Sequence, residues 1–460
     1  MAAILALPLE IISHIFACVD RDSRRNLRLV HSLFNTIGQR WVFRSTQLAP
    51  TPRSCDHFEK VLETPDLIRF VRKVYLQTYD EDTDITSEQG DSDGEDEYEL
   101  SDPEDELVRP RRFWSLFERL KEFPQLQSVA LCFHHTCVEE TSDHWVDDIP
   151  QDINFRSTVM QRFTDVVASL PHLPQELIIQ DLQNINDTDS TVVANIRKIL
   201  GGLKSLRLNI TNEHSEGNGE TDLERDAPHE FFPELSSFWL KPALSSLEHL
   251  TIYSSNYFGF YPKCDLRGTH FPRLESLALG NYTFVHDSQL DWILSHAPTL
   301  TGLYLDDCPI LYEVAIRDKE RTYLDPADLQ PDPRFDGEGY ASYDKRWKDY
   351  FQAFKEGLPL LQHFRYGHCL AWWEHDTTPL ECETEIEVAL RHDSYMVYCD
   401  GYGPSQYMAH MIYTIRQEGD IKWEDGEPLR CTDEDINALK ELCAKLRQPL
   451  ANDGWNPVDS

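Results

Sequence analysis

Hydrophobic residues at helical spacing open the chain, in the segment LPLEIISHIFACVD. The spacing predicts a helix with Pro8 and Glu10 in its first turn. Proline has no N–H to leave unpaired there, and a carboxylate is favoured at the positive end of a helix. The apolar side chains of this helix form one wide stripe: Ile11, Ile12, Ile15, Phe16 and Val19.

Two more short helices are expected in the same N-terminal region. The segment DSRRNLRLVHSLFNTI carries Leu27, Val30 and Phe34 on one face, and Gly38 is expected to end that helix. The segment QRWVFRSTQL is expected to form the third helix. Three helices of this length cannot bury all their large apolar side chains among themselves. Their surface is therefore expected either to cap the next domain or to bind another protein.

After these helices the pattern changes to the spacing L-x-x-L-x-L, which is typical of the strands of leucine-rich repeats. The matching segments are VRKVYL, LQSVAL, LKSLRL, LEHLTI, LESLAL, LTGLYL and LQHFRY, with a looser match in PQELII. Three of them begin at Leu247, Leu274 and Leu300, which are 27 and 26 residues apart. Longer gaps elsewhere indicate insertions or degenerate copies.

Amphipathic segments that end in proline or glycine precede several of these strands: FWSLFERLKEFP, STVMQRFTDVVASLP, TVVANIRKILGG, SQLDWILSHAP and KRWKDYFQAFKEGLP. Helix and strand in alternation give a parallel sheet flanked on one side by helices, and each repeat must stack on its neighbours to bury its apolar face. We therefore expect an α/β fold with three parts. They are a helical module at residues 1–48, a leucine-rich-repeat-like β/α solenoid at 49–370 and an irregular C-terminal cap at 371–460.

The residues between and just after the strand leucines are expected to face the concave side of the solenoid. This rule nominates ten candidates for binding a target protein: Lys73, Tyr75, Arg207, His249, Tyr253, Asn281, Tyr304, Asp306, Arg365 and His368. Their mixed polar and aromatic character is typical of protein-binding surfaces, although each could also be an ordinary solvated strand residue. Cys308 and Cys369 occupy the repeat position where Asn or Cys is usual, and both are expected to be buried packing groups.

Charge and cysteine usage narrow the possible partners and the compartment. The net charge is −37, which disfavours non-specific binding to nucleic acid. The 11 cysteines include no C-x-x-C pair, as expected for reduced thiols in cytoplasm or nucleus. No apolar run approaches the roughly 18 residues of a membrane-spanning helix. Asp80–Glu106 contains 15 acidic and no basic residues, so residues 80–110 are expected to form a disordered loop that interrupts the solenoid.

The C-terminal region is rich in tryptophan and tyrosine, and its segment TDEDINALKELCAKL is predicted to form a helix with Thr432 as the N-cap. A solenoid needs its last repeat covered, so this region is interpreted as a cap. A small ligand-binding or partner site is equally compatible with it. The helix is expected to bury one face: Ile436, Leu439, Leu442 and Leu446.

Motifs for catalysis, cofactors and metals are weak or missing. The segment CFHHTC combines two Cys with two His, but four ligands within six residues cannot all reach one tetrahedral zinc ion, and Cys132 lies on a predicted strand. GYGP lacks both the P-loop lysine and the Rossmann spacing, and there is no GxSxG, HExxH or kinase signature. We therefore expect no catalytic residue, no cofactor and no bound metal.

The N-terminal segment resembles an F-box, in which Leu-Pro, an acidic residue, paired Ile or Leu, Ile-Phe and then Leu-x-x-Val-x-x-x-Phe follow in order. The matching residues, which the resemblance implies bind a Skp-type adaptor, are Leu7, Pro8, Glu10, Ile11, Ile15, Phe16, Leu27, Val30 and Phe34. The irregular repeats that follow are similar to those of many fungal F-box proteins.

The resemblance implies a non-enzymatic substrate receptor of an SCF-type (Skp-cullin-F-box) ubiquitin ligase. The adaptor would link the chain to a cullin, and the repeats would hold an unknown target protein. Two alternatives stay open. One is a repeat scaffold that binds partners without entering a ligase, and the other is an enzyme housed in residues 371–460.

Overall fold

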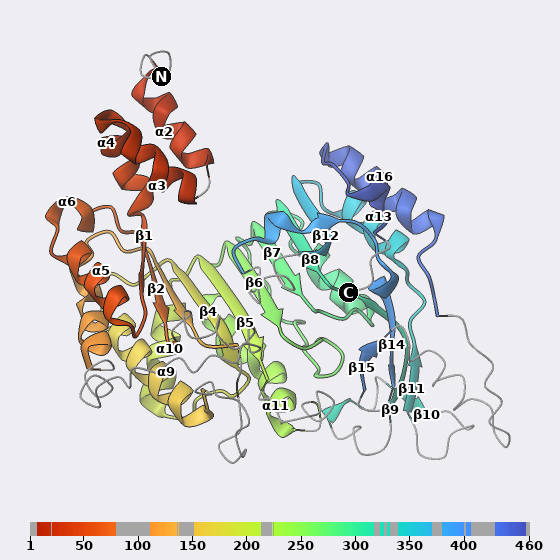
Figure 1. Ribbon diagram of the computed structural model, residues 1–460. Helices are drawn as coiled ribbons and strands as arrows, with labels where there is room; N and C mark the ends of the chain where they lie inside the picture. Colours follow the sequence, from red (N-terminus) through yellow and green to blue (C-terminus); the bar gives the residue numbers. More distant parts are fainter. Residues whose placement is uncertain are drawn as a thin grey trace, which may run out of the picture. The chain divides into compact units, whose positions relative to one another are not determined.

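The computed structural model describes residues 7–19, 21–79, 111–135, 137, 151–212, 223, 225–316, 323–325, 329–331, 339–369, 380–399, 402–405 and 428–456 (Figure 1). The chain is α/β, and its main sheet has ten strands in the order β1-β2-β3-β4-β5-β6-β7-β8-β12-β13. The expected α/β class with a largely parallel sheet is confirmed. The expected acidic loop at 80–110 lies outside the described residues.

The chain divides into two compact units, which are described separately below. The first unit comprises the described residues up to His134 together with 158–179, and the second comprises 135, 137, 151–157 and the described residues from 180 onward. Helix α9 (Ile153–Ala168) and strand β4 (Glu176–Gln183) each contain residues of both units. Among the described residues, no helix is both long and apolar enough to cross a lipid bilayer.

Three helices open the first unit: α2 (Leu9–Cys18), α3 (Arg21–Val30) and α4 (Ser32–Val42). They enclose a small core in which Ile12, Phe16 and Phe34 are buried. The rings of Phe16 and Phe34 meet edge to face, with centroids 6.2 Å apart. This core holds the helices together through the burial of large side chains.

Two details of this region differ from the sequence prediction. Gly38 does not end a helix but lies inside α4, where an added Cβ would be 2.8 Å from the Phe16 ring. The chain breaks instead at His31, whose Nδ1 caps α4 by accepting a hydrogen bond from the Leu33 N–H at 3.1 Å. The segment expected to complete the third helix ends as strand β1 (Ser45–Leu48), because its backbone pairs with β2.

The rest of the first unit builds parallel strands from the predicted segments. Its elements are α5 (Pro52–Leu62), α6 (Pro65–Ile68), β2 (Lys73–Gln77), η1 (Glu118–Glu122) and β3 (Ser128–Cys132). The register aligns Ser45 with Lys73 and Lys73 with Ser128. Proline begins both α5 and α6, at the helix position where its missing N–H has no partner.

The second unit continues the alternation of helix and parallel strand. Its elements in this part are α10 (Ser190–Leu200), β5 (Ser205–Thr211), α11 (Asp226–Leu235), η3 (Ser236–Leu240), η4 (Lys241–Ala243), β6 (His249–Ser254), β7 (Ser276–Gly280), α12 (Asp287–Leu294), β8 (Gly302–Asp306), α13 (Trp347–Gly357) and β12 (His363–His368). Strands β5 to β8 and β12 are parallel. All eight segments that were predicted to be strands do form strands, β2 to β8 and β12.

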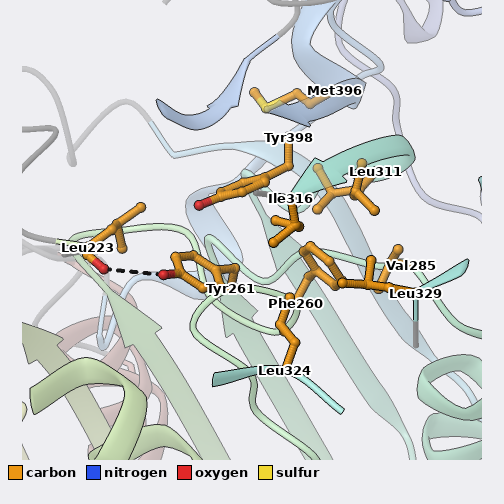
Figure 2. Packing of buried hydrophobic residues seen from close by; sticks show 11 residues of the cluster. Leu223, Phe260, Tyr261, Val285, Leu311, Ile316, Leu324, Leu329, Met396 and Tyr398 are labelled. Atoms are coloured by element: carbon orange, nitrogen blue, oxygen red, sulfur yellow. Dashed lines mark hydrogen bonds between the residues drawn. The ribbon is translucent and has the colours of Figure 1, made fainter. Parts of the chain in front are cut away.

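A second sheet, in the order β10-β11-β9-β14-β15, was not predicted. Its strands are β9 (Ile310–Ile316), β10 (Gln330–Pro331), β11 (Gly339–Ser342), β14 (Tyr395–Cys399) and β15 (Tyr402–Ser405). It joins strands from both sides of the boundary expected at residue 370. Figure 2 shows the apolar cluster beside it, in which the rings of Tyr261 and Tyr398 lie 5.2 Å apart.

The C-terminal part adds β13 (Glu387–Val388), antiparallel to β12, and helix α16 (Asp433–Leu446). The remaining short elements are η7 (Glu383–Glu385), η8 (His392–Ser394) and η9 (Asn452–Gly454). Thr432 caps α16 as predicted, and α16 lies beside α13 (Figure 1). The Lys348 N–H at the start of α13 donates to Asp435 Oδ1 of α16 at 2.9 Å.

Candidate functional site

The first candidate site is an apolar surface on helix α2. The side chains of Leu9, Ile11 and Ile15 expose 56%, 48% and 38% of their area, and Leu7 just before the helix exposes 37%. Residues four apart lie on the same face of a helix, so Ile11 and Ile15 form an apolar row, and Leu7 and Leu9 add exposed apolar side chains at its N-terminal end. Exposed apolar side chains gathered in this way mark interaction sites more often than isolated ones do.

A second exposed apolar pair lies at the end of α3. Leu29 and Val30 expose 75% and 48% of their area, and they line one side of a pocket of about 720 Å³. Phe43 and Leu67 contribute apolar surface to the same pocket. Leu29 and Val30 are the last two residues of α3, because the chain leaves that helix at His31 and begins α4.

The residues nominated for adaptor binding fall into two groups. Leu7, Pro8, Glu10, Ile11, Ile15 and Val30 are exposed, while Leu27 is half-buried. Phe16 and Phe34 are 1% and 5% exposed, so the expectation that they face a partner is corrected. Their large rings fill the core between the helices, where each buries more apolar area than it could on a surface. Leu9 and Leu29 belong to the exposed surface but were not nominated.

The ten residues nominated for target binding are called the inner row. Its members in the first unit, Lys73 and Tyr75, are half-buried. The Lys73 ammonium lies 3.2 Å from Glu176 Oε2 and 5.1 Å from the centre of the Tyr75 ring. Glu176 also accepts a hydrogen bond from the Ser128 hydroxyl at 2.5 Å. Glu176 on β4 therefore contacts both Lys73 on β2 and Ser128 on β3.

In the second unit, several nominated residues form a buried polar cluster at the ends of the strands. The Tyr253 hydroxyl donates to Asp306 Oδ2 at 3.1 Å, and the Cys369 N–H donates to Asp306 Oδ1 at 2.9 Å. Burial raises the pKa of the Asp306 carboxyl, and the neighbouring Asp307 raises it further. Cys308 and Cys369 are buried beside this cluster, as predicted.

Two further contacts close the strand ends. His368 Nδ1 lies 2.6 Å from Asp307 Oδ2, and Asn281 donates from its side-chain amide to the Ser254 carbonyl at 2.8 Å. Asn281 and Asp307 both have positive φ angles, of 59° and 47°, directly after β7 and β8. Asparagine and aspartate tolerate this left-handed conformation better than most residues, so these positions serve the turns that leave the strands.

Arg207 is held by residues far along the chain. Its Nη1 donates to the Leu380 carbonyl at 2.6 Å, to Glu383 Oε1 at 2.5 Å and to Thr251 Oγ1 at 3.2 Å. Burial raises the pKa of the nearby Tyr304, and the charge of Glu383 raises it further. The Leu380 carbonyl and the Glu383 carboxylate therefore both contact Arg207 of the inner row.

The inner row is consequently less open than the repeat rule predicts. Tyr253, Tyr304, Asp306 and His368 are buried, so the expectation that they form an accessible binding face is corrected. The physical reason is that the turns after the strands and the segment beginning at Leu380 cover them. The nominated residues that keep partial exposure in this unit are Arg207, His249, Asn281 and Arg365.

Asp306, Asp307 and His368 have potential metal-ligand atoms within 4.8 Å of one another. Both oxygens of Asp306 already accept hydrogen bonds, and His368 is paired with Asp307. Burial raises the pKa of the Asp306 carboxyl and so disfavours the charged form that a metal ion would need. The cluster therefore satisfies its own polar groups and links the ends of β6, β8 and β12.

Neither protein-family models nor curated proteins yield a match to this chain. Among the described residues, the accessible apolar surface of α2 is the feature most typical of a protein-binding site.

Proposed function

We propose that the chain is the substrate-recognition subunit of an SCF-type ubiquitin ligase. In this proposal the N-terminal helices bind a Skp-type adaptor, the repeats bind a target protein, and other subunits transfer ubiquitin. The chain itself contributes proximity and orientation, which can accelerate a reaction without any catalytic side chain. The observation that carries the proposal is the exposed apolar row on α2, in the segment that resembles an F-box.

The energetics of the apolar row support a docking role. Burying an apolar side chain contributes about 25 cal/mol for each Å² removed from water, so a partly exposed Ile or Leu contributes on the order of 1 kcal/mol. Leu7, Leu9, Ile11 and Ile15 together could therefore supply several kcal/mol to an interface. Phe16 acts indirectly, because it holds α2 against α4 and thereby fixes the direction of the row.

We further propose that the parallel strands form a leucine-rich-repeat-like solenoid. Supporting this, β6, β7 and β8 follow one another along the chain at repeat spacing and align residue by residue, with His249 beside Ser276 and Ser276 beside Gly302. The accessible inner-row residues then define the target-binding candidates. They are Lys73 and Tyr75 in the first unit, and Arg207, His249, Asn281 and Arg365 in the second.

The test is co-purification of the full chain with a Skp-type adaptor and a cullin. The double variant Ile11→Ala/Ile15→Ala removes exposed apolar surface from α2, and we expect it to capture adaptor at least tenfold less well. The matched control is Ile185→Ala/Leu360→Ala, since these side chains are 39% and 46% exposed outside the helical module. The control should bind like the wild type.

Equal capture by wild type and the α2 variant would contradict adaptor docking through this row. Capture of the adaptor without the cullin would favour the alternative, a non-ligase repeat scaffold for protein–protein interaction. Both double variants remove exposed side chains, so their thermal unfolding should match that of the wild type. Phe16→Ala, in contrast, should unfold the helical module, because it deletes a buried ring at a cost of about 3–5 kcal/mol.

A further inference from the structure

Four arginines converge on one groove of the first unit, although the chain as a whole carries a net charge of −37. The groove has a volume of about 720 Å³, and its charged and aromatic lining residues are Arg40, Arg44, Arg69, Arg72, Trp41 and Phe70. Such a concentration of one charge in a chain of opposite sign is unexpected for a surface that serves only solubility.

The strand register brings two of these arginines together. Arg44 and Arg72 immediately precede β1 and β2, and the Arg44 carbonyl accepts hydrogen bonds from the N–H groups of Arg72 at 2.7 Å and Lys73 at 3.1 Å. The Arg72 carbonyl accepts in the same way from Gln127, before β3, at 2.8 Å. Neighbouring strands lie about 4.8 Å apart, so the backbones of Arg44 and Arg72 are side by side at the same edge of the sheet.

The other two arginines join from the preceding segments. Arg40 lies one helical turn before Arg44, at the end of α4, and donates to the Ser13 hydroxyl. Arg69 follows α6 and lies 3.4 Å from Asp66 in an exposed ion pair. Within the part of the chain that the structure describes, no carboxylate forms an ion pair with the guanidinium of Arg40, Arg44 or Arg72.

Aromatic rings support the guanidinium groups. The guanidinium carbons of Arg40 and Arg44 lie 5.7 Å and 5.9 Å from the centre of the Trp41 ring, and that of Arg69 lies 4.9 Å from the centre of Phe70. A guanidinium over a ring is restrained while its N–H edge remains able to donate. The arrangement therefore combines several like charges with donors that a ligand can reach.

We propose that this arginine groove binds the phosphate chain of a small organic diphosphate or triphosphate. Guanidinium forks match phosphate oxygens two at a time, and three charges without a carboxylate partner match the three to four negative charges of such a chain. The groove volume lies in the range of small-molecule sites. A single phosphoserine brings fewer charges, and the chain's overall charge repels long nucleic acid. The proposal does not depend on adaptor binding.

Calorimetric titration of the full chain with four probes tests the proposal. We expect inorganic tripolyphosphate and adenosine triphosphate to bind in a one-to-one ratio, more weakly as salt is added. If adenosine triphosphate binds more tightly than tripolyphosphate, the groove also recognises the nucleoside. If the two bind equally, the groove recognises the phosphate chain alone. A phosphoserine peptide and a short single-stranded oligonucleotide should both bind more weakly, and tighter binding of either would overturn the proposal.

The decisive variant is Arg44→Gln/Arg72→Gln, which should weaken tripolyphosphate binding by roughly a hundredfold, since each charge-assisted contact contributes about tenfold or more. Arg53→Gln/Arg197→Gln is the matched control, because it removes the same charge from exposed positions outside the groove. Wild-type affinity in the control and loss in the groove variant would support the proposal. Equal loss in both variants, or no binding by the wild type, would overturn it. Circular dichroism spectra of both variants check that the fold is kept.

Discussion

His296 should make the second unit sensitive to acid. The ring is fully buried, its Nδ1 lies 2.9 Å from the Trp292 carbonyl, and its Nε2 accepts a hydrogen bond from the Phe271 N–H at 3.2 Å. This pair of contacts fits the neutral ring, because a proton on Nε2 would face the N–H of Phe271. Burial lowers the pKa of His296 from 6.5 to about 4.

The sign and the size of the effect follow from this pKa. Between pH 6.5 and about 4 the unfolded chain takes up a proton at His296 and the folded chain does not, so stability falls as the pH falls. The full effect is about 3 kcal/mol, at 1.36 kcal/mol for each pKa unit, and about 1 kcal/mol of it should be lost between pH 8 and pH 5.5. Above about pH 7 the contribution of His296 is constant.

The assay is urea unfolding at a series of pH values, for the full chain and for His296→Gln. Because two compact units need not unfold together, amide hydrogen exchange across residues 271–296 provides the local free energy. The variant should lose the acid-dependent part of the stability, whereas His363→Gln, at an exposed position, should keep it. A wild-type slope in His296→Gln, or stability that rises on acidification through this histidine, would refute the reasoning.

Three further changes in the second unit have defined outcomes. Gly280→Ala should lower the melting temperature, at a cost of about 1–3 kcal/mol, because the added Cβ would lie 2.2 Å from the Tyr253 ring. Burial raises the pKa of the Asp306 carboxyl, so the wild type should lose stability as the pH rises above about 4, which is the opposite of the effect of His296. Asp306→Asn should remove this pH dependence, as measured by the same urea series. Glu383→Gln should cost about 1–2 kcal/mol in urea unfolding, because it removes the charge 2.5 Å from Arg207.

The parallel strands β2 to β8 and β12 could be predicted because their signal is local. Each L-x-x-L-x-L segment has apolar residues that the sheet buries, as in β6, where Leu250 and Ile252 are buried. The helices before the strands carry their own amphipathic spacing, and Thr432 caps α16 with a side chain only three residues from Asp435. Local patterns of this kind specify secondary structure before any long-range contact forms.

The errors all depend on contacts that the local pattern does not contain. Gly38 stays helical because its missing side chain admits the Phe16 ring from another helix. Residues 45–48 become a strand because β2 offers a parallel partner. The inner row is partly buried because Glu383 reaches Arg207 across 176 residues of sequence. A contact between segments this far apart in the sequence produces no local pattern of hydrophobic and polar residues in either segment.

The burial of the inner row changes where recognition is expected. In the second unit, the Tyr253 hydroxyl is directed at Asp306 and the His368 ring at Asp307, so these polar groups stabilise the strand ends. In the first unit, the apolar row of α2 and the arginine groove remain accessible among the residues that the structure describes. Substitutions in the polar cluster should therefore change stability without changing adaptor or triphosphate binding. Substitutions in the α2 row and the groove should each change one binding reaction, leave the other intact and leave stability unchanged.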